Sequence, residues 1–198
     1  MTTTRHNQSG FTLIETLIAI LILSLTIGAL LTLTAGGFFS IRYAKNDIVA
    51  ANLLQESLEY VRNTRDSTSQ SSTGASWDQW ITTYQDNGCF SADGCLINPY
   101  ASDPLDAVYS CSGDCDHITY FTDVGFYGYV GHGSNYFDTM AGSNVITTSF
   151  VRKVTMRLQT IPTAPDPELV VTARMDWLNG TNPKHTQQSI ILTKWNLR

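Results

Sequence analysis

The stretch that decides the fold is GFTLIETLIAILILSLTIGALLTLTAGGFF, residues 10–39. Between Arg5 and Arg42 the only formally charged side chain is Glu15, and the 23 residues from Leu17 to Phe39 carry no charge. A membrane-spanning helix needs about 20 apolar residues to cross the hydrocarbon core. The stretch therefore predicts one helix long enough to span a membrane, with lipid as its first partner.

The order of segments around this helix differs from that of an ordinary secretory signal. Residues 1–10, MTTTRHNQSG, are polar, and Gly10 is followed at once by Phe11 and the apolar run. A secretory signal is cut after its apolar region, which here would remove the anchor. Cleavage at Gly10 would retain the anchor on the mature chain.

The sequence Gly10-Phe11-Thr12-Leu13-Ile14-Glu15, followed by a long apolar run, resembles the N-terminus of type IV pilins and pseudopilins. The resemblance implies a prepilin leader over residues 1–10 and cleavage after Gly10 by a membrane prepilin peptidase. It also implies N-methylation of the new Phe11 terminus by the same enzyme. The expected location is the bacterial cytoplasmic membrane, crossed once, and then an extracellular filament or the cell surface.

Glu15 is the unusual residue of the apolar run. Insertion scales place the cost of an Asp at the centre of a membrane helix at about 2.5 to 3.5 kcal/mol, so an intramembrane acid indicates function. In the family, the counterpart of Glu15 meets the free N-terminal amine of an adjacent subunit, and that amine exists only after cleavage at Gly10. The alternative is a plain signal anchor in which Glu15 lies near the lipid headgroups and needs no partner.

The periodicity of the next segment predicts that the helix continues beyond the membrane, from Phe11 to Asp66. Apolar residues recur every three or four positions and form a predicted stripe: Ile41, Ala44, Ile48, Ala51, Leu54, Leu58 and Val61. Polar residues between them are assigned to the solvent side of an amphipathic helix: Lys45, Asn46, Glu56, Glu59, Arg62 and Arg65. Gly28 and Gly36-Gly37 weaken the helix locally, which suits either close helix packing or a segment that melts in a filament.

The chain is accordingly divided into a leader, a membrane helix over 11–40, an amphipathic extension over 41–66 and an extracellular head over 67–198. The head is expected to open with a polar linker, STSQSS at 67–72, and a loop region is expected over 87–104. A short helix with a core-facing aromatic stripe is predicted between them, with Ser76 as its N-cap, from the spacing of Trp77, Trp80, Ile81 and Tyr84.

The C-terminal third changes to a period of two, which predicts half-buried strands at 153–158 and 169–177 and a returning strand at 189–195. Asn179-Gly180 marks the turn before the last strand. Three antiparallel strands can lay one apolar face on the helix stripe. The predicted fold class is α+β, with a long N-terminal helix packed on an antiparallel sheet. The type IV pilin fold has the same architecture.

Four cysteines, Cys89, Cys95, Cys111 and Cys115, follow the membrane helix, and an exported domain would hold them as two disulfides. Three pairings are possible. The two local loops, Cys89 with Cys95 and Cys111 with Cys115, are favoured because Gly and Asp turn residues lie within each. The rival is a zinc site that adds His117, but the spacing lacks the C-x2-C pairs of common zinc modules. No metal or cofactor is predicted.

Charge and motif content argue against other functions. The net charge is −5 and the basic residues are scattered, so nucleic-acid binding is not expected. An acidic group lacks the spacing of a calcium loop and is taken as solvated: Asp103, Asp106, Asp114, Asp116 and Asp123. There is no Gly-x-Ser-x-Gly or His-Glu-x-x-His motif, and GFYGYVGHG at 125–133 lacks a phosphate-loop ending. The chain is predicted not to be an enzyme, and a membrane-anchored exported enzyme is the weakest alternative.

The predicted function is a structural subunit of a type IV pilus-like or type II secretion-like filament. Three phrases look like minor pilin or minor pseudopilin sequences: 54–62, 150–154 and 192–195. Its partners would be prepilin peptidase, other pilin or pseudopilin subunits and the inner-membrane assembly platform. A tip adhesin or DNA-receptor pilin is the alternative. The sequence leaves pilus, secretion and DNA-uptake systems open.

Overall fold

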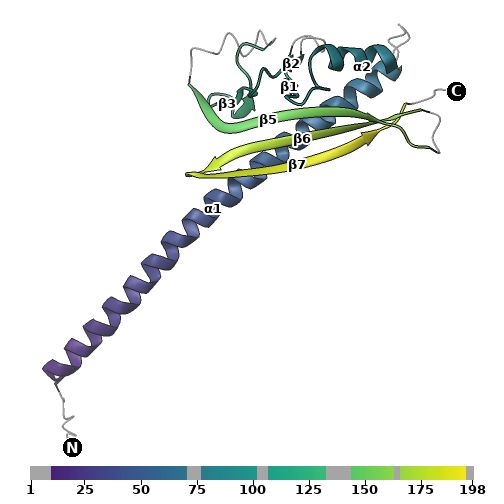
Figure 1. Ribbon diagram of the computed structural model, residues 1–198. Coiled ribbons are helices and arrows are strands. Elements are labelled where there is room, and N and C mark those ends of the chain that lie inside the picture. The colour runs from purple at the N-terminus through teal and green to yellow at the C-terminus, as the bar shows by residue number, and fades with distance from the viewer. Residues whose placement is uncertain (1–9, 71–76, 102–106, 133–143, 163–165, 195–198) are drawn as a thin grey trace, which may run out of the picture. The chain divides into compact units, whose positions relative to one another are not determined.

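The computed structural model describes residues 10–70, 77–101, 107–132, 144–162 and 166–194 (Figure 1). The chain divides into two compact units, Met1–Lys45 and Asn46–Arg198, and each is described by itself.

Among the described residues of the first unit, all those from Leu13 onward belong to the N-terminal part of α1 (Leu13–Gln70). Its large hydrophobic side chains are all exposed, and the least exposed are Tyr43 at 42% and Ile27 at 49%. Each of five hydroxyl groups donates to a backbone carbonyl three or four residues earlier, those of Thr16, Ser24, Thr26, Thr32 and Thr34. Lipid offers no hydrogen-bond partners, so such internal bonding lets polar side chains lie in a membrane helix.

α1 is the one helix in the described part of the chain that is long and apolar enough to cross a membrane. It remains helical at Gly28 and at Gly36-Gly37. No atom lies within 4 Å of a Cβ added at any of these glycines.

The end of α1 differs from the prediction. The helix continues to Gln70, so the predicted end at Asp66 and the predicted linker are wrong for residues 67–70. The hydroxyl of Thr68 donates to the carbonyl of Thr64 at 2.8 Å, and Thr64 itself contacts a second helix. These contacts outweigh the weak helix propensity of Ser and Thr. The remainder of the linker, 71–72, and the predicted N-cap Ser76 lie outside the described residues.

The buried side of α1 in the second unit also differs from the predicted stripe. The buried residues are Ala50, Leu53, Leu54, Ser57, Leu58, Val61 and Arg65. Leu54, Leu58 and Val61 were assigned correctly, but Ile41, Ala44, Ile48 and Ala51 are exposed. The spacing between consecutive residues of the predicted stripe averages less than the 3.6 residues of one helical turn. The predicted stripe therefore drifts around the helix. The predicted solvent side also differs from the structure, because Arg65 is buried and Asn46, Glu56 and Arg62 are partly buried.

Three long antiparallel strands form the main sheet: β5 (Val145–Gln159), β6 (Glu168–Asn179) and β7 (Asn182–Leu192). β6 pairs with both neighbours, and Asn179 opposes Asn182 across a two-residue turn. Gly180 in that turn has φ +66°, a left-handed conformation that glycine adopts without a steric penalty. The predicted meander and turn are confirmed.

Four short strands lie on the other side of β5: β1 (Cys95–Ile97), β2 (Val108–Ser110), β3 (His117–Phe121) and β4 (Phe126–Gly128). β1 and β3 both pair with β5, and β2 and β4 extend the sheet outward. Among the described residues the sheet has seven strands, all paired antiparallel.

Several strand boundaries correct the sequence prediction. β5 is much longer than 153–158, and Leu158 is 43% exposed rather than in the core. β7 begins at Asn182 instead of Ser189. The prediction missed the first half of this strand because its residues are polar and show no apolar alternation. It ends at Leu192, and Trp195 lies outside the described residues. The segment 87–104, expected to be a loop throughout, contains β1.

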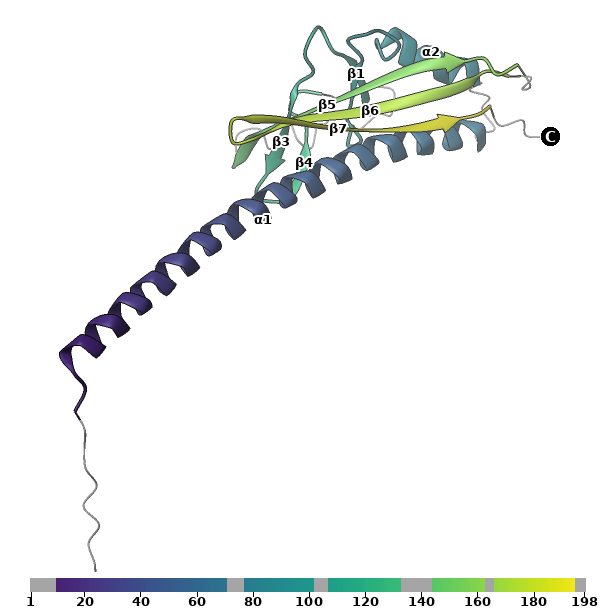
Figure 2. The same ribbon diagram turned by 60° about the horizontal axis from the view of Figure 1, so that its bottom comes forward.

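The core of the second unit lies between α1 and the sheet. Alternate residues of β6 face the buried side of α1: Leu169, Val171, Ala173, Met175 and Trp177. Figure 2 shows the part of α1 that belongs to the second unit running along one face of the ribbon formed by β5, β6 and β7. A long N-terminal helix packed on an antiparallel sheet is thus confirmed as the architecture.

The predicted short helix is α2 (Trp77–Asp86), and its aromatic stripe belongs to the core as expected. Trp80, Ile81 and Tyr84 are buried. The Trp80 indole nitrogen donates to the Thr64 hydroxyl at 3.3 Å, and the Tyr84 hydroxyl lies 3.0 Å from the same oxygen. Burial raises the pKa of Tyr84, which favours its neutral form. α2 is therefore attached to the C-terminal end of α1.

The structure joins Cys89 to Cys95 and Cys111 to Cys115, the two local pairs, and leaves no cysteine free. Both loops are short, so each bond restricts the unfolded chain modestly. A Cys89→Ser, Cys95→Ser double variant is expected to lose about 2 kcal/mol of unfolding free energy.

Urea unfolding of the full chain in detergent checks that value. Non-reducing mass spectrometry of the parent should show a mass four hydrogens below that of the reduced chain, as two disulfides require. A peptide linking Cys89 to Cys111 or Cys115 would contradict the pairing.

Candidate processing and assembly site

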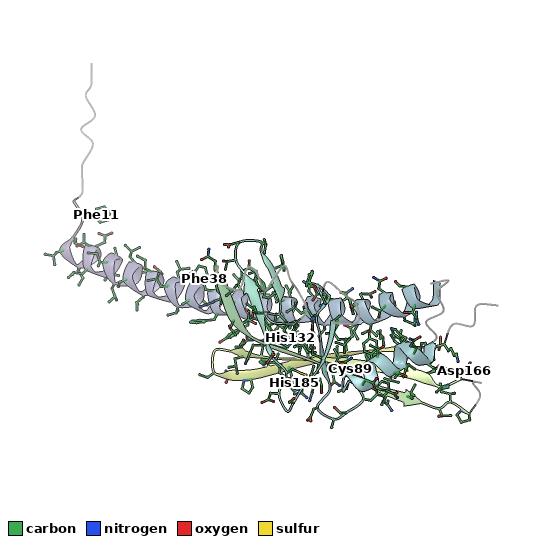
Figure 3. All side chains as sticks on the ribbon, turned by 90° about the horizontal axis from the view of Figure 1, so that it is seen from above. Phe11, Phe38, Cys89, His132, Asp166 and His185 are labelled. Carbon is green, nitrogen blue, oxygen red and sulfur yellow. A yellow bond between two sulfur atoms is a disulfide. The ribbon has the colours of Figure 1, made fainter. Side chains whose placement is uncertain are left out.

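The N-terminal motif begins in non-helical chain immediately before α1. Gly10, Phe11 and Thr12 precede the helix, and the Thr12 carbonyl accepts from the amides of Glu15 at 3.1 Å and Thr16 at 3.3 Å. Phe11 is 80% exposed at the start of α1 (Figure 3). A Cβ added at Gly10 would meet no atom within 4 Å. The peptide bond between Gly10 and Phe11 is therefore in exposed, irregular chain.

Glu15 lies in the first turn of α1, and its side chain is exposed. The N-terminus of a helix carries partial positive charge, and an acid there stabilises the helix by about 0.3 to 1 kcal/mol. Thr12 and Glu15 also have the spacing of a capping box, a start signal that the sequence analysis missed. Within the described residues, the carboxylate of Glu15 has no ion-pair partner.

A second group of functional interest lies in the core, around Arg152 on β5. Its neighbours Val154 and Met156 point inward, and Arg152 shares their face with only 1% exposure. Nη1 donates to the carbonyl of Leu53 at 2.6 Å and to Glu56 Oε2 at 3.0 Å, and Nη2 donates to the carbonyl of Ile97 at 2.7 Å. One guanidinium thus connects α1, β1 and β5.

The electrostatics of this group keep Arg152 charged. Burial alone would lower the pKa of Arg152, but Tyr129 and Glu56 raise it, and the net shift is upward. The guanidinium carbon lies 5.6 Å from the centre of the Tyr129 ring, a cation–π distance. Burial also raises the pKa of Tyr129. Tyr100, next to Glu56, has its pKa raised to about 12, first by burial and then by that carboxylate.

Sequence reasoning missed Arg152 as a core residue. The strand around Val154 was predicted. Arg152 lies two residues earlier and therefore shares the inward face, but it was not predicted to be buried. The partners of Arg152 are 99, 96 and 55 residues away in sequence, so no local pattern identifies them.

The remaining candidates do not form a metal site. In the described part of the chain, no group of three or more His, Cys, Asp or Glu side chains could hold a metal ion. All four cysteines are in disulfides, which leaves no thiolate to join His117 on zinc. Asp114 and Asp116 are exposed, and Asp116 lies 2.6 Å from the ring of His132. Asp103 and Asp106 lie outside the described residues.

An exposed Gly-Phe pair precedes a long apolar helix with one acid in its first turn, and the helix packs on an antiparallel sheet, which is a pilin-like architecture. The chain matches the family model of the prokaryotic N-terminal methylation motif over residues 5–31, which is the signal of the type IV pilin family. The match supports a type IV pilin or pseudopilin-like subunit, with processing by prepilin peptidase and assembly with other pilin subunits. It indicates a structural, non-enzymatic protein, and the apolar helix fits membrane anchoring followed by a filament.

Comparison with curated proteins finds no match, and comparison with solved structures finds none either.

Proposed function

We propose that the chain is a minor subunit of a type IV pilus-like or type II secretion-like filament. It is made with a leader over residues 1–10, cut after Gly10 and methylated at Phe11. A single helix over 11–40 holds it in the bacterial cytoplasmic membrane, from which the inner-membrane platform assembles it into the extracellular filament. The observation that carries the proposal is the methylation motif at 5–31, with its cleavage point in exposed chain just before α1.

The chemistry of Glu15 supports a coupling between processing and assembly. A carboxylate in the apolar part of a membrane needs a cation, and the described residues supply none to Glu15. Cleavage after Gly10 creates a free amine at Phe11. Four helical residues span about 6 Å, so pairing this amine with Glu15 of a neighbour would shift the two helices by about that distance.

The head is proposed to lie outside the membrane and to be stapled by its two disulfides. Exported domains keep disulfides, whereas the cytosol reduces them. The amphipathic extension, 41–66, is proposed to join the membrane helix to this head. Burial of Leu54, Leu58 and Val61 against the sheet supports that role for the extension.

The Glu15→Gln variant tests the assembly role, because it removes the charge and keeps the shape. The variant is expected to be cut after Gly10 like the parent, and its incorporation into filaments to fall by at least about tenfold, as loss of about 1.4 kcal/mol or more requires. Immunoblots of sheared filaments and of membranes, from cells that carry the assembly machinery, measure both steps. Thr26→Val, a change at another exposed polar side chain of the helix, is the matched control. Equal incorporation of Glu15→Gln and parent would rule out the ion pair.

A further inference from the structure

A small cleft lies beside α1 in the second unit, away from the processing motif. Its volume is about 230 Å³, and one of its walls is the side of α1 between Val49 and Glu56. Three aromatic side chains from other segments share the lining: Tyr100, Phe126 and Tyr127. We call this site the α1 cleft. Ligand pockets in proteins typically measure about 300 to 1,000 Å³, so the α1 cleft suits a small ligand with a single ring.

The aromatic rings of the α1 cleft are supported by other rings. The centre of the Phe126 ring lies 5.4 Å from that of Tyr100 and 5.8 Å from that of the buried Phe121. The ring of Tyr127 meets the buried Phe150 edge to face at 6.3 Å. Tyr100 is 43% exposed, so the cleft is open to solvent. Rings that are already fixed lose less conformational freedom when a ligand packs on them.

Polar groups lie among these rings. The side chain of Asn52 is exposed and has no hydrogen-bond partner among the described residues. The side chain of Glu56 is 26% exposed, and its carboxylate can accept more hydrogen bonds than the one from Arg152. Tyr100 and Tyr127 add phenolic hydroxyls. The α1 cleft can therefore form several hydrogen bonds with one ligand, as donor and as acceptor.

The charge of the α1 cleft is balanced from within the core. Glu56 is the charged residue among the described residues that line the cleft, and it pairs with Arg152 at 3.0 Å. Arg152 is 1% exposed and remains charged behind Glu56. A cationic ligand would be opposed by Arg152 and an anionic ligand by Glu56. The α1 cleft therefore favours an uncharged ligand.

We infer that the α1 cleft binds a neutral sugar in its pyranose form. A pyranose is an uncharged ring with a face of C–H groups and hydroxyls around its edge. Its C–H groups pack against the electron-rich face of an aromatic ring, and its hydroxyls can both donate to and accept from groups such as Asn52 and Glu56. A tyrosine side chain of a peptide has a similar size but only one hydroxyl, so it would leave most of these polar groups unpaired. The inference goes beyond the proposed function, because it adds a carbohydrate site to the head.

Binding of simple sugars to the full chain tests the site. The chain is purified in a polyoxyethylene detergent, because detergents with sugar headgroups would compete for the cleft. The probes are the methyl pyranosides of glucose, galactose and mannose, and ligand-observed NMR titration measures their affinities. At least one of the three is expected to bind with a Kd below about 10 mM, the weak range that a single ring in a small cleft gives.

Two variants assign the binding to the α1 cleft. Tyr100→Ala removes a ring and Asn52→Ala removes a hydrogen-bonding amide, and each should weaken the binding by about threefold or more. Tyr43→Ala and Gln55→Ala are the matched controls and should bind like the parent. Tyr43 is 42% exposed and Gln55 is exposed, and neither lines the cleft. Asn52 is an exposed residue of α1, so the Asn52→Ala variant is expected to fold, and urea unfolding checks this.

Three results would overturn the inference. The first is that none of the three pyranosides binds with a Kd below about 10 mM. The second is that either cleft variant loses less than about threefold in affinity. The third is that tetramethylammonium or N-acetyltyrosinamide binds more tightly than all three sugars, since the cleft would then serve a cation or an aromatic side chain.

Processing at Gly10 and the effect of Glu15→Gln do not depend on the α1 cleft. Failure of the sugar titrations alone would leave the proposed function in place.

Discussion

Replacing Arg152 by alanine is expected to lower the unfolding free energy of the second unit by about 3 to 5 kcal/mol, the range for breaking a buried ion pair. Arg152 is 1% exposed and donates to two backbone carbonyls as well as to Glu56. Without Arg152, the carbonyls of Leu53 and Ile97 each lose a hydrogen-bond donor in the core. Urea unfolding of the full chain in detergent, followed by tryptophan fluorescence, measures the change.

Two further variants separate this role from charge alone. Arg152→Lys should recover little of the loss, because one ammonium group cannot reach three acceptors arranged for a guanidinium. Lys153→Ala, at the adjacent outward position without an ion pair among the described residues, should change stability by less than about 0.5 kcal/mol. An Arg152→Ala variant within about 1 kcal/mol of the parent would contradict the structural role.

Replacing Gly10 by leucine is expected to abolish processing and, with it, entry into filaments. The leader would remain, Phe11 would have no free amine, and Glu15 of a neighbour would lose its proposed partner. Coexpression with a prepilin peptidase, followed by immunoblotting of membranes, should show the unprocessed size. Gly28→Leu is the matched control, because the same change at a glycine inside the apolar helix meets no neighbouring atom within 4 Å. Normal processing of Gly10→Leu would contradict the proposed cleavage site.

The parts of the molecule that sequence predicted well are those with local causes. The apolar helix follows from a long uncharged run, and β6 follows from the alternation of apolar and polar residues between Val171 and Trp177. The exposed Gly10-Phe11 pair was visible in the same way, as a polar segment that meets an apolar one. In each case neighbouring residues alone determine the result.

What sequence could not predict depends on distant partners. Arg152 is buried because Leu53, Glu56 and Ile97 come from other elements. The first half of β7 is a strand because β6 pairs with it, although its residues are polar. The phase of the buried stripe on α1 is likewise set by where the sheet lies, which is why Ile48 is exposed and Arg65 is not. Tertiary contact overrides local preference at each of these positions.

The central claim is that the chain functions only after cleavage exposes Phe11 as its N-terminus. Mass spectrometry of the N-terminal peptide, from full chain recovered from membranes that contain a prepilin peptidase, tests this most directly. The account predicts a peptide that begins at Phe11 and is heavier by one methyl group. A mature chain that still begins at Met1 would contradict it.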